Sequence, residues 1–397
     1  MLTKAKKTKP LFDKFTAIKE RHEMAKLLGT SPIGVPFEKI LTPTKALFEG
    51  REITLVGTNN YLGLTFNENV RRSMIDAIET LGSATTGSRQ ANGTYGDHAA
   101  LEQELKAYFG AASAIVFTTG YQTNLGAISA LASGDDHILI DADSHACIYD
   151  ACRLTDAATH RFRHNDPENL NKRLQRLPET GARLVVVEGM YSMFGDVAPL
   201  DELVEVAHAH DAMIFVDEAH SVGCFGEKGR GIAEAKGVFE DVDFISGTFS
   251  KSLASIGGFC VSKHPEFESI RLTSRAYMFT ASGAPANISA ARAALDELQK
   301  QPELRESLWA MSNKLHGGLA EMGFDLCAPA SPVIAVRRPD EVTAVREWNE
   351  LFEQGVYVNL AVPPATPGGT SLLRLSVSAA HSADEIDHVL KAFSNLT

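Results

Sequence analysis

Residues 213–220 read MIFVDEAH, an apolar run that ends in two acids and a histidine. Four consecutive apolar residues of this kind are typical of a buried strand. A second apolar run starts at Phe244 and leads into residues 247–251, which read GTFSK. Ligands bind at the carboxyl ends of strands in open α/β sheets. We therefore expect the polar groups that follow both runs to lie together at one edge of a sheet.

These polar groups match what pyridoxal phosphate (PLP) requires of a protein. Lys251, between two serines, is a candidate for the Schiff-base lysine, and Asp217 for the partner of a protonated pyridine nitrogen. Each residue alone also has an ordinary interpretation, because most lysines are solvated and an Asp after a strand often caps a helix. Their occurrence together, with His220 three residues after Asp217, favours the PLP interpretation.

The segments VDEAHS (216–221) and GTFSK (247–251) resemble the α-oxoamine synthases, a PLP-dependent family of fold-type I. The resemblance extends from about Phe37 to the C-terminus. It implies a mostly parallel sheet in a large domain, followed by a smaller α+β C-terminal domain. Apolar runs that alternate with amphipathic helices independently favour such a parallel sheet with right-handed crossovers.

Three segments are expected along the chain. Residues 1–45 are predicted to form an N-terminal helix and linker, residues 46–285 the large PLP-binding domain, and residues 286–397 the small C-terminal domain. The character of the sequence changes near residue 286, where a long amphipathic helix is predicted to leave the large domain.

The turn after the apolar run 114–117 leads directly into a predicted helix, and helix N-termini bind anions. We therefore predict that Gly120 and Tyr121 bind the PLP phosphate. The resemblance implies further roles in and around the cofactor. His145 is expected to stack on the ring, His220 to bond to the phenolate oxygen, and Thr248 to contact the phosphate. Ser192 is expected to approach the ring, and Asn60 to lie close to the cofactor. In a homodimer Thr280 would contact the phosphate of the other protomer, and Arg374 would bind the amino-acid carboxylate.

Composition excludes several other classes of protein. Hydrophobic residues make up 44% of the chain and charged residues 22%, as in globular proteins. A net charge of −12 argues against general nucleic-acid binding. Five scattered cysteines without a Cys-x-x-Cys pair indicate neither a metal site nor a disulfide framework. No apolar run approaches the ~20 residues of a membrane span, and no secretion signal is recognisable, so we expect a cytoplasmic protein.

The N-terminal region carries Lys4, Lys6, Lys7 and Lys9, followed by a predicted amphipathic helix over 11–28. We favour a helix that packs on its own protomer or on a partner subunit. Peripheral contact with an anionic membrane surface, attracted by the four lysines, is the second interpretation.

The resemblance implies decarboxylative condensation of an amino acid with an acyl thioester, carried by CoA or by an acyl carrier protein. Serine and palmitoyl-CoA are the expected substrates, which would give 3-ketosphinganine, the first step of sphingolipid synthesis. Two departures bear on this expectation: Val362 precedes PPATP (363–367) where the serine-using members have Arg, and residues 283–285 read GAP where the family often has LPP. A synthase that uses alanine or glycine is therefore the first alternative, a fold-type I aminotransferase the second, and a non-enzymatic PLP-binding regulator the third.

Overall fold

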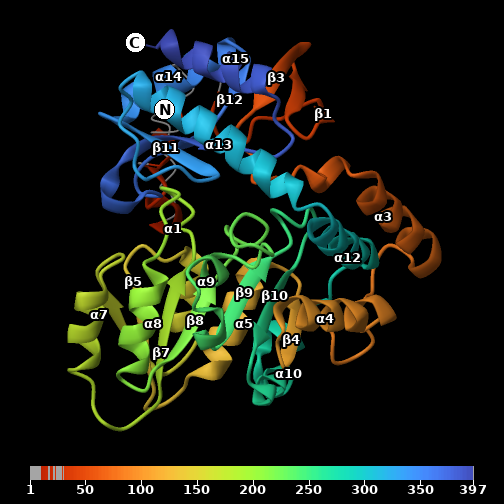
Figure 1. The fold of residues 1–397 in the computed structure, drawn as a ribbon, viewed down its shortest axis with the longest axis vertical. Coiled ribbons are helices and arrows are strands. Elements are labelled where there is room, and N and C mark those ends of the chain that lie inside the picture. The colour runs from red at the N-terminus through yellow and green to blue at the C-terminus, as the bar shows by residue number, and fades with distance from the viewer. Residues whose placement is uncertain (1–9, 17, 21–22, 24–28, 30, 397) are drawn as a thin grey trace, which may run out of the picture.

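The computed structural model describes residues 10–16, 18–20, 23, 29 and 31–396. A seven-stranded sheet with helices on both faces forms one part of the molecule, and two smaller sheets with their helices form the other (Figure 1). Both parts are joined by the long helices α12 (Pro285–Lys300) and α13 (Glu303–Glu321).

The large sheet has the strand order β4-β10-β9-β8-β7-β5-β6, and all strands except β10 run in one direction. Its strands are β4 (Ser113–Phe117), β5 (His137–Asp141), β6 (Ala158–Phe162), β7 (Arg183–Glu188), β8 (Met213–Asp217), β9 (Phe244–Thr248) and β10 (Gly258–Ser262). The predicted mostly parallel sheet is confirmed. The carboxyl ends of the parallel strands consequently meet at one edge.

Side chains of successive strand residues point to opposite faces of the sheet. In β7, Val185 and Val187 therefore enter one apolar core, whereas Leu184 and Val186 enter another. Apolar residues on both faces require helices on both faces, as a parallel sheet normally has. The first core is closed by α4 (Gly96–Phe109), α7 (Pro167–Leu174) and α8 (Leu200–His208), and the second by α5 (Gly120–Leu131) and α6 (Ala146–Arg153).

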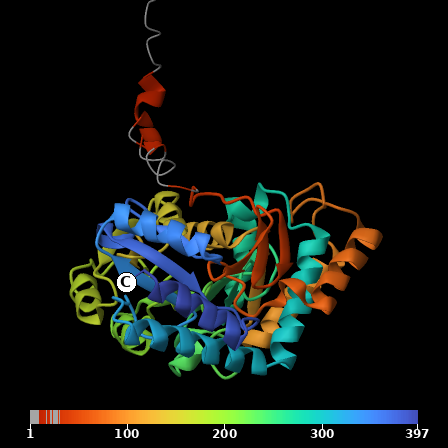
Figure 2. The ribbon, with the colours of Figure 1, turned by 90° about the horizontal axis from the view of Figure 1, so that it is seen from above.

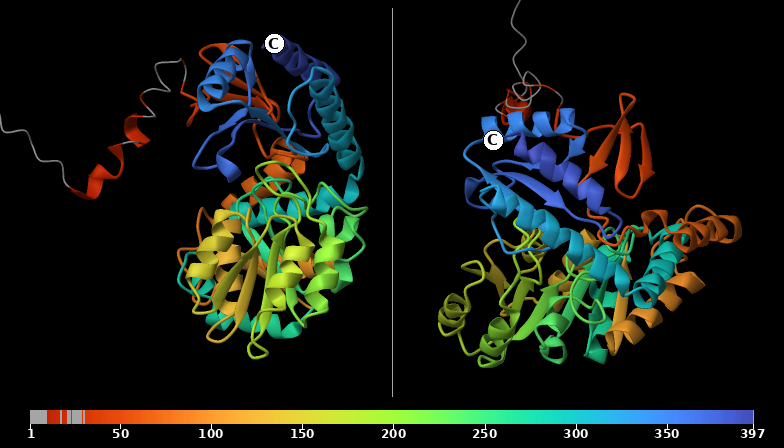
Figure 3. Two further views of the ribbon diagram at one scale, coloured as in Figure 1. Left: turned by 90° about the vertical axis from the view of Figure 1, so that its left-hand side faces the viewer. Right: turned by 45° about the horizontal axis from the view of Figure 1, so that its top comes forward.

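The smaller part contains two sheets, which lie near one another in two views (Figures 1 and 3). Their orders are β1-β2-β3-β12 and β11-β14-β13. The strands are β1 (Lys39–Thr42), β2 (Lys45–Phe48), β3 (Arg51–Leu55), β11 (Val333–Arg338), β12 (Val356–Tyr357), β13 (Asn359–Ala361) and β14 (Ser371–Ser376). Because β3 pairs with β12, residues 39–55 share a sheet with the C-terminal segment. We therefore propose that these residues belong with the small domain, whereas the sequence grouped 46–285 as one unit.

The remaining helices pack around these sheets. The longer ones are α3 (Glu68–Leu81), α14 (Glu341–Glu353) and α15 (Ala383–Ser394), and the short ones α9 (Ile232–Ala235), α10 (Ile270–Thr273) and α11 (Arg275–Met278). Hydrogen bonds from Asn67 and Asn69 to the Glu297 carboxylate, 3.0 and 2.7 Å long, tie the start of α3 to α12. The α15 helix begins with a capping box between Ser382 and Glu385.

The structure describes only part of the predicted N-terminal helix. Helix α1 spans only Pro10–Asp13, a turn at 14–15 interrupts it, and it projects away from the sheets (Figures 2 and 3). Leu11 and Phe12 remain exposed there, whereas residues 16, 18–20 and 23 are again helical; the rest of the predicted helix over 11–28 lies outside the described residues. The predicted basic tail of residues 1–9 lies outside the described residues. Among the described helices, none has the length and apolar character needed to cross a membrane.

Candidate active site

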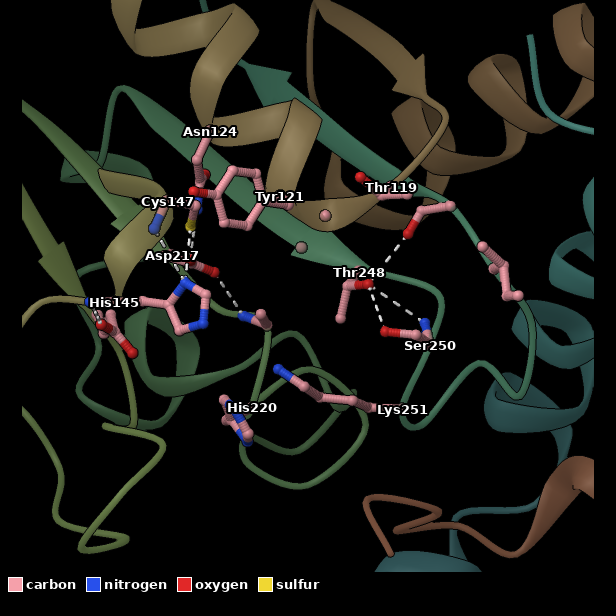
Figure 4. A pocket seen from close by; sticks show the side chains of 16 residues that line it. Thr119, Tyr121, Asn124, His145, Cys147, Asp217, His220, Thr248, Ser250 and Lys251 are labelled. Atoms are coloured by element: carbon pink, nitrogen blue, oxygen red, sulfur yellow. Dashed lines mark hydrogen bonds between the residues drawn. The ribbon is translucent and has the colours of Figure 1, made fainter. Parts of the chain in front are cut away.

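A cavity of about 430 Å³ lies where β7, β8 and β9 end. It brings together residues that are up to 138 positions apart in the chain, from Thr119 to Gly257, and Figure 4 shows most of their side chains around one space. The predicted residues that line it are Gly120, Tyr121, His145, Asp217, His220, Thr248 and Lys251. The expectation that the polar groups after the two apolar runs share one sheet edge is therefore confirmed.

Asp217 is the last residue of β8 and only 6% exposed. The sheet register places it between Glu188 on β7 and Ser246 on β9. Its Oδ2 accepts a 2.6 Å bond from Asn124 Nδ2, and its Oδ1 accepts a 2.9 Å bond from the Ala219 N–H. The Asn124 amide is itself oriented by Ser246 Oγ, which donates to Asn124 Oδ1 at 2.8 Å. Donors on both oxygens hold the carboxylate in one orientation.

Lys251 follows β9 and extends its amine into the cavity between His145 and His220 (Figure 4). Loss of water around the amine lowers its pKa to about 8, although the carboxylates of Asp217 and Glu188 favour the charged form. At neutral pH the ammonium form still predominates, but the neutral, nucleophilic fraction is far larger than in a solvated lysine. That property is required of a lysine that forms a Schiff base or removes a proton.

Thr119 caps α5, and its hydroxyl accepts a bond from the Gln122 N–H. Gly120 and Tyr121 are the first residues of the helix, so their backbone N–H groups belong to the unpaired first turn. A Cβ at Gly120 would lie 2.7 Å from Thr248 Cβ, so only glycine lets the start of α5 lie this close to the end of β9. The Tyr121 hydroxyl turns to Asp150. The helix dipole and the free N–H groups together form an anion site. Thr248 borders this site, and its hydroxyl donates to the Gly257 carbonyl oxygen at 3.0 Å.

Two histidines face the cavity, and both are held neutral. The Cys147 N–H donates to His145 Nδ1, and partial burial lowers the pKa of His145. Burial also lowers the pKa of His220 well below its ordinary value, with the charges of Lys251 and Arg374 adding to the effect. The Tyr61 hydroxyl lies 2.7 Å from His220 Nδ1, and burial raises the pKa of Tyr61. The Tyr61 hydroxyl also lies 3.4 Å from Asn59 Oδ1. If Tyr61 donates to Nδ1, the ring proton of His220 is on Nε2.

Sequence reasoning missed three residues of this site: Asn124, Cys147 and Glu188. Glu188 is buried at the end of β7, and burial together with Asp217 raises its pKa. Its Oε1 accepts a bond from the backbone N–H of His145. The sequence did contain a signal for Glu188, because it is an acid directly after the apolar residues 184–187. For Asn124, one turn inside a helix, the sequence offers none.

The other predicted residues lie outside this cavity. Asn60 lines an adjacent cavity of about 340 Å³, which shares Lys251 with the first. Its Oδ1 is buried without a hydrogen-bond partner among the described residues, and its Nδ2 donates to Thr65 Oγ1 at 2.8 Å. Thr280 stands apart from both, and its hydroxyl accepts a bond from Gln122 Nε2 at 3.2 Å.

Ser192 and Arg374 line a third cavity of about 650 Å³, which meets the first at His220. Arg374 lies on β14 of the small domain and is only 7% exposed. Its Nε donates to the Ser192 carbonyl oxygen at 2.7 Å, and its Nη1 donates to Ser376 Oγ at 2.9 Å. None of the ion pairs among the described residues involves Arg374. A buried guanidinium bonded to neutral groups favours an anionic ligand beside it.

These features test whether the residues fit PLP. An anion site at the start of α5 suits a phosphate, the fixed Asp217 carboxylate suits a protonated pyridine nitrogen, and Lys251 offers a neutral amine. All three line one cavity of suitable size for a small cofactor. The residues present fit the cofactor.

Comparison with known proteins agrees with this geometry. Residues 51–393 match the family model of class I and II aminotransferases. Serine palmitoyltransferase of Caulobacter vibrioides is 51% identical over 97% of this chain and 96% of its own length. The Sphingomonas paucimobilis enzyme of the same name is 48% identical over 96% and 92%. The chain belongs to the α-oxoamine synthases of the class I and II aminotransferase family.

Solved structures of the family have the same fold. A serine palmitoyltransferase determined with PLP superposes with a TM-score of 0.96, at 47% identity and with 98% of each chain covered. The Sphingomonas wittichii serine palmitoyltransferase gives a TM-score of 0.95 at 49% identity, again with 98% of each chain covered. The predicted fold-type I architecture of an α-oxoamine synthase is therefore confirmed.

Proposed function

We propose that this protein is a PLP-dependent C-acyltransferase that condenses L-serine with palmitoyl-CoA, forming 3-ketosphinganine, CoA and CO2. In this reaction the α-carbon of serine bonds to the thioester carbonyl carbon, the thiol leaves, and the serine carboxylate leaves as CO2. The observation that carries the proposal is the cavity in which Lys251, Asp217 and the start of α5 meet. Near-full-length relatives named serine palmitoyltransferase support the choice of substrates.

When bound, PLP withdraws electrons from the α-carbon of the amino acid, provided that its pyridine nitrogen is protonated. Asp217 would keep a proton on that nitrogen, because two donors fix its carboxylate at the base of the cavity. The first turn of α5 and Thr248 would hold the phosphate. His145 would cover one face of the ring, and His220, with its proton on Nε2, would donate to the phenolate oxygen.

Lys251 would supply the covalent attachment and then act as the general base that removes the α-proton. A general base works best when its pKa lies near the working pH. The pKa of about 8 for Lys251 lies much closer to neutral pH than the ordinary value of 10.5, so more of the amine is available as a base. Glu188 and Asp217 lie close enough to stabilise the ammonium that results.

Arg374 would bind the serine carboxylate, since it is a buried cation without an acidic partner among the described residues. Asn60, on the other side of Lys251, would contact the bound substrate. The acyl chain would occupy the third cavity, whose wall includes Ile33, Leu360 and Val362. An apolar wall suits a long hydrocarbon chain.

The resemblance also supports a homodimer in which Thr280 contacts the phosphate bound by the partner subunit. Leu272 and Phe279, each 72% exposed, flank this region, and large apolar side chains at one surface favour an interface. Sedimentation would reveal an active monomer if this part of the proposal is wrong. A cytoplasmic location is proposed because all five cysteines are unpaired.

Alanine or glycine is the alternative amino acid, because Val362 places an apolar side chain in the cavity of Arg374. Incubation of the purified protein with PLP, palmitoyl-CoA and each of serine, alanine and glycine tests the choice through thiol release. We expect release to be fastest with serine. Faster thiol release with alanine or glycine would show that this amino acid, and not serine, is the substrate. Formation of a 2-oxo acid without thiol release would indicate an aminotransferase.

A further inference from the structure

His164 lies between the carboxylates of Asp141 and Asp196. Its Nδ1 is 2.8 Å from Asp141 Oδ1, and its Nε2 is 2.7 Å from Asp196 Oδ2. Asp141 ends strand β5, whereas Asp196 belongs to the turn that follows β7. One imidazole thus links the rigid sheet to a turn.

The adjacent residue strengthens this link. The Asn165 N–H donates to Asp141 Oδ2 and its Nδ2 donates to Asp196 Oδ2, each at 2.8 Å. Asn165 has a φ of 49°, a conformation that Asn tolerates better than most residues. Burial lowers the pKa of His164, but the bonds to both carboxylates outweigh it and raise the pKa to about 10. The link is therefore a charged bridge at neutral pH.

The turn that the bridge holds is compact. Tyr191 N–H donates to the Asp196 carbonyl oxygen at 2.9 Å, and Gly195 N–H donates to the Tyr191 carbonyl oxygen at 3.0 Å. The ring of His164 also meets the ring of Tyr191 edge to face, with 4.5 Å between centroids. Ser192, near the tip, offers its carbonyl oxygen to Arg374 Nε. The bridge and the bond to Arg374 are therefore only four residues apart.

The other side of the turn touches the small domain. A Cβ at Gly195 would lie 2.1 Å from the Val333 carbonyl oxygen on β11. Strand β11 pairs with β14, and Ala335 is opposite Arg374 in their register. The turn is thus fixed by the bridge on one side and by the strand next to Arg374 on the other.

We propose that His164 is a positioning residue for Arg374, acting through Asp196 and the Ser192 carbonyl oxygen. The guanidinium of Arg374 then meets the amino-acid carboxylate in one fixed orientation. Without the bridge, the turn would move and the Ser192 carbonyl oxygen would no longer direct Nε. This inference rests on the proposed function, because it takes Arg374 as the carboxylate-binding group.

The test compares His164→Ala with His264→Ala in the PLP-loaded protein. His264 forms a similar 2.8 Å pair with Asp243, but near the start of β9, at the opposite edge of the sheet. Serine affinity is read from the cofactor absorbance, and PLP affinity is measured without serine. We expect His164→Ala to weaken serine binding about ten-fold with PLP affinity unchanged, and His264→Ala to leave both unchanged.

A second pair of variants guards against a folding defect in His164→Ala. Asp196→Ala removes the anchor of the turn but leaves the His164–Asp141 pair, and Asp196→Asn keeps an oxygen that accepts from the ring. We expect weaker serine binding in Asp196→Ala and partial rescue in Asp196→Asn. The inference is overturned if the folded His164→Ala or Asp196→Ala protein binds serine as tightly as the parent, or loses PLP and serine affinity equally. A parent protein that binds no serine would instead overturn the proposed function.

Discussion

At the scale of single residues, burial sets the protonation states around the cofactor cavity. It lowers the pKa of Lys251 to about 8, lowers the pKa of His220, and raises the pKa of Glu188. Each shift favours the uncharged form of its group beside the fixed carboxylate of Asp217. Lys251 and Asp217 were predicted because each follows an apolar run, whereas the roles of both histidines came from the family resemblance. Asn124 and Glu188 were not predicted, because their partners lie 93 and 43 positions away.

The pKa of Lys251 predicts how PLP attachment depends on pH. Only the neutral amine attacks the aldehyde, and because the pKa is lowered, the neutral fraction rises as the pH passes about 8. The rate at which the cofactor-free protein incorporates PLP, followed by absorbance, should therefore have its midpoint near this value. A midpoint near 10.5, the ordinary value of a lysine, would show that burial does not act on this amine.

Asp217→Asn should retain the fold and PLP binding but lose nearly all turnover. The amide preserves the shape and an oxygen for Asn124, yet it cannot stabilise a proton on the pyridine nitrogen. Thiol release and circular dichroism provide the two measurements. Glu205→Gln, an exposed position on α8, is a matched control that should leave both unchanged. If Asp217→Asn turned over nearly as fast as the parent, the proposed role of Asp217 would be contradicted.

At the scale of elements, the site depends on strand ends and on one helix N-terminus. Strands β8 and β9 and helix α5 were predicted nearly as observed, because each is a buried apolar run or follows one. Strand β6 and helix α7 were not predicted, since β6 reads ATHRF and α7 reads PENLNKRL, both mostly polar. The pairing of β3 with β12 was also missed, because about 300 residues separate the strands and a local pattern carries no pairing information.

Gly120→Ala tests the anion site at the start of α5. The added Cβ would lie 2.7 Å from Thr248 Cβ, and relief of this contact moves the helix away from the phosphate position. Overpacking costs about 1–3 kcal/mol, so we expect PLP affinity to fall by about ten-fold or more. The matched control is Gly96→Ala, at the first residue of α4, where a Cβ meets nothing within 4 Å. Equal PLP affinities for both variants would contradict a phosphate site at α5.

At the scale of the whole molecule, the substrate cavities lie where the large sheet faces the small domain. Lys251 and Asp217 come from the large sheet, whereas Arg374 comes from β14 of the small one. His220 lines both the cofactor cavity and the apolar cavity beside Arg374. The resemblance identified Arg374 from the sequence, but only the fold shows that it has no acidic partner among the described residues.

Arg374→Ala should weaken serine binding by about one to two decades, because a charged hydrogen bond contributes about 1.5–3 kcal/mol. PLP attachment should remain intact, and Arg337→Ala, an exposed arginine on β11, serves as the control. Val362→Arg adds a second cation to the same cavity and should tighten serine binding. Titration of the cofactor absorbance with serine measures all three variants. Unchanged serine affinity in Arg374→Ala would place the carboxylate elsewhere.

The central claim is that the protein joins serine to an acyl thioester with loss of the serine carboxylate. The most direct measurement supplies the PLP-loaded protein with palmitoyl-CoA and serine labelled at its carboxyl carbon, and follows labelled CO2 and free thiol together. The proposed function predicts one labelled CO2 for each thiol released, and neither product with the Lys251→Ala variant. Label retained in a 2-oxo acid, or thiol release without labelled CO2, would contradict it.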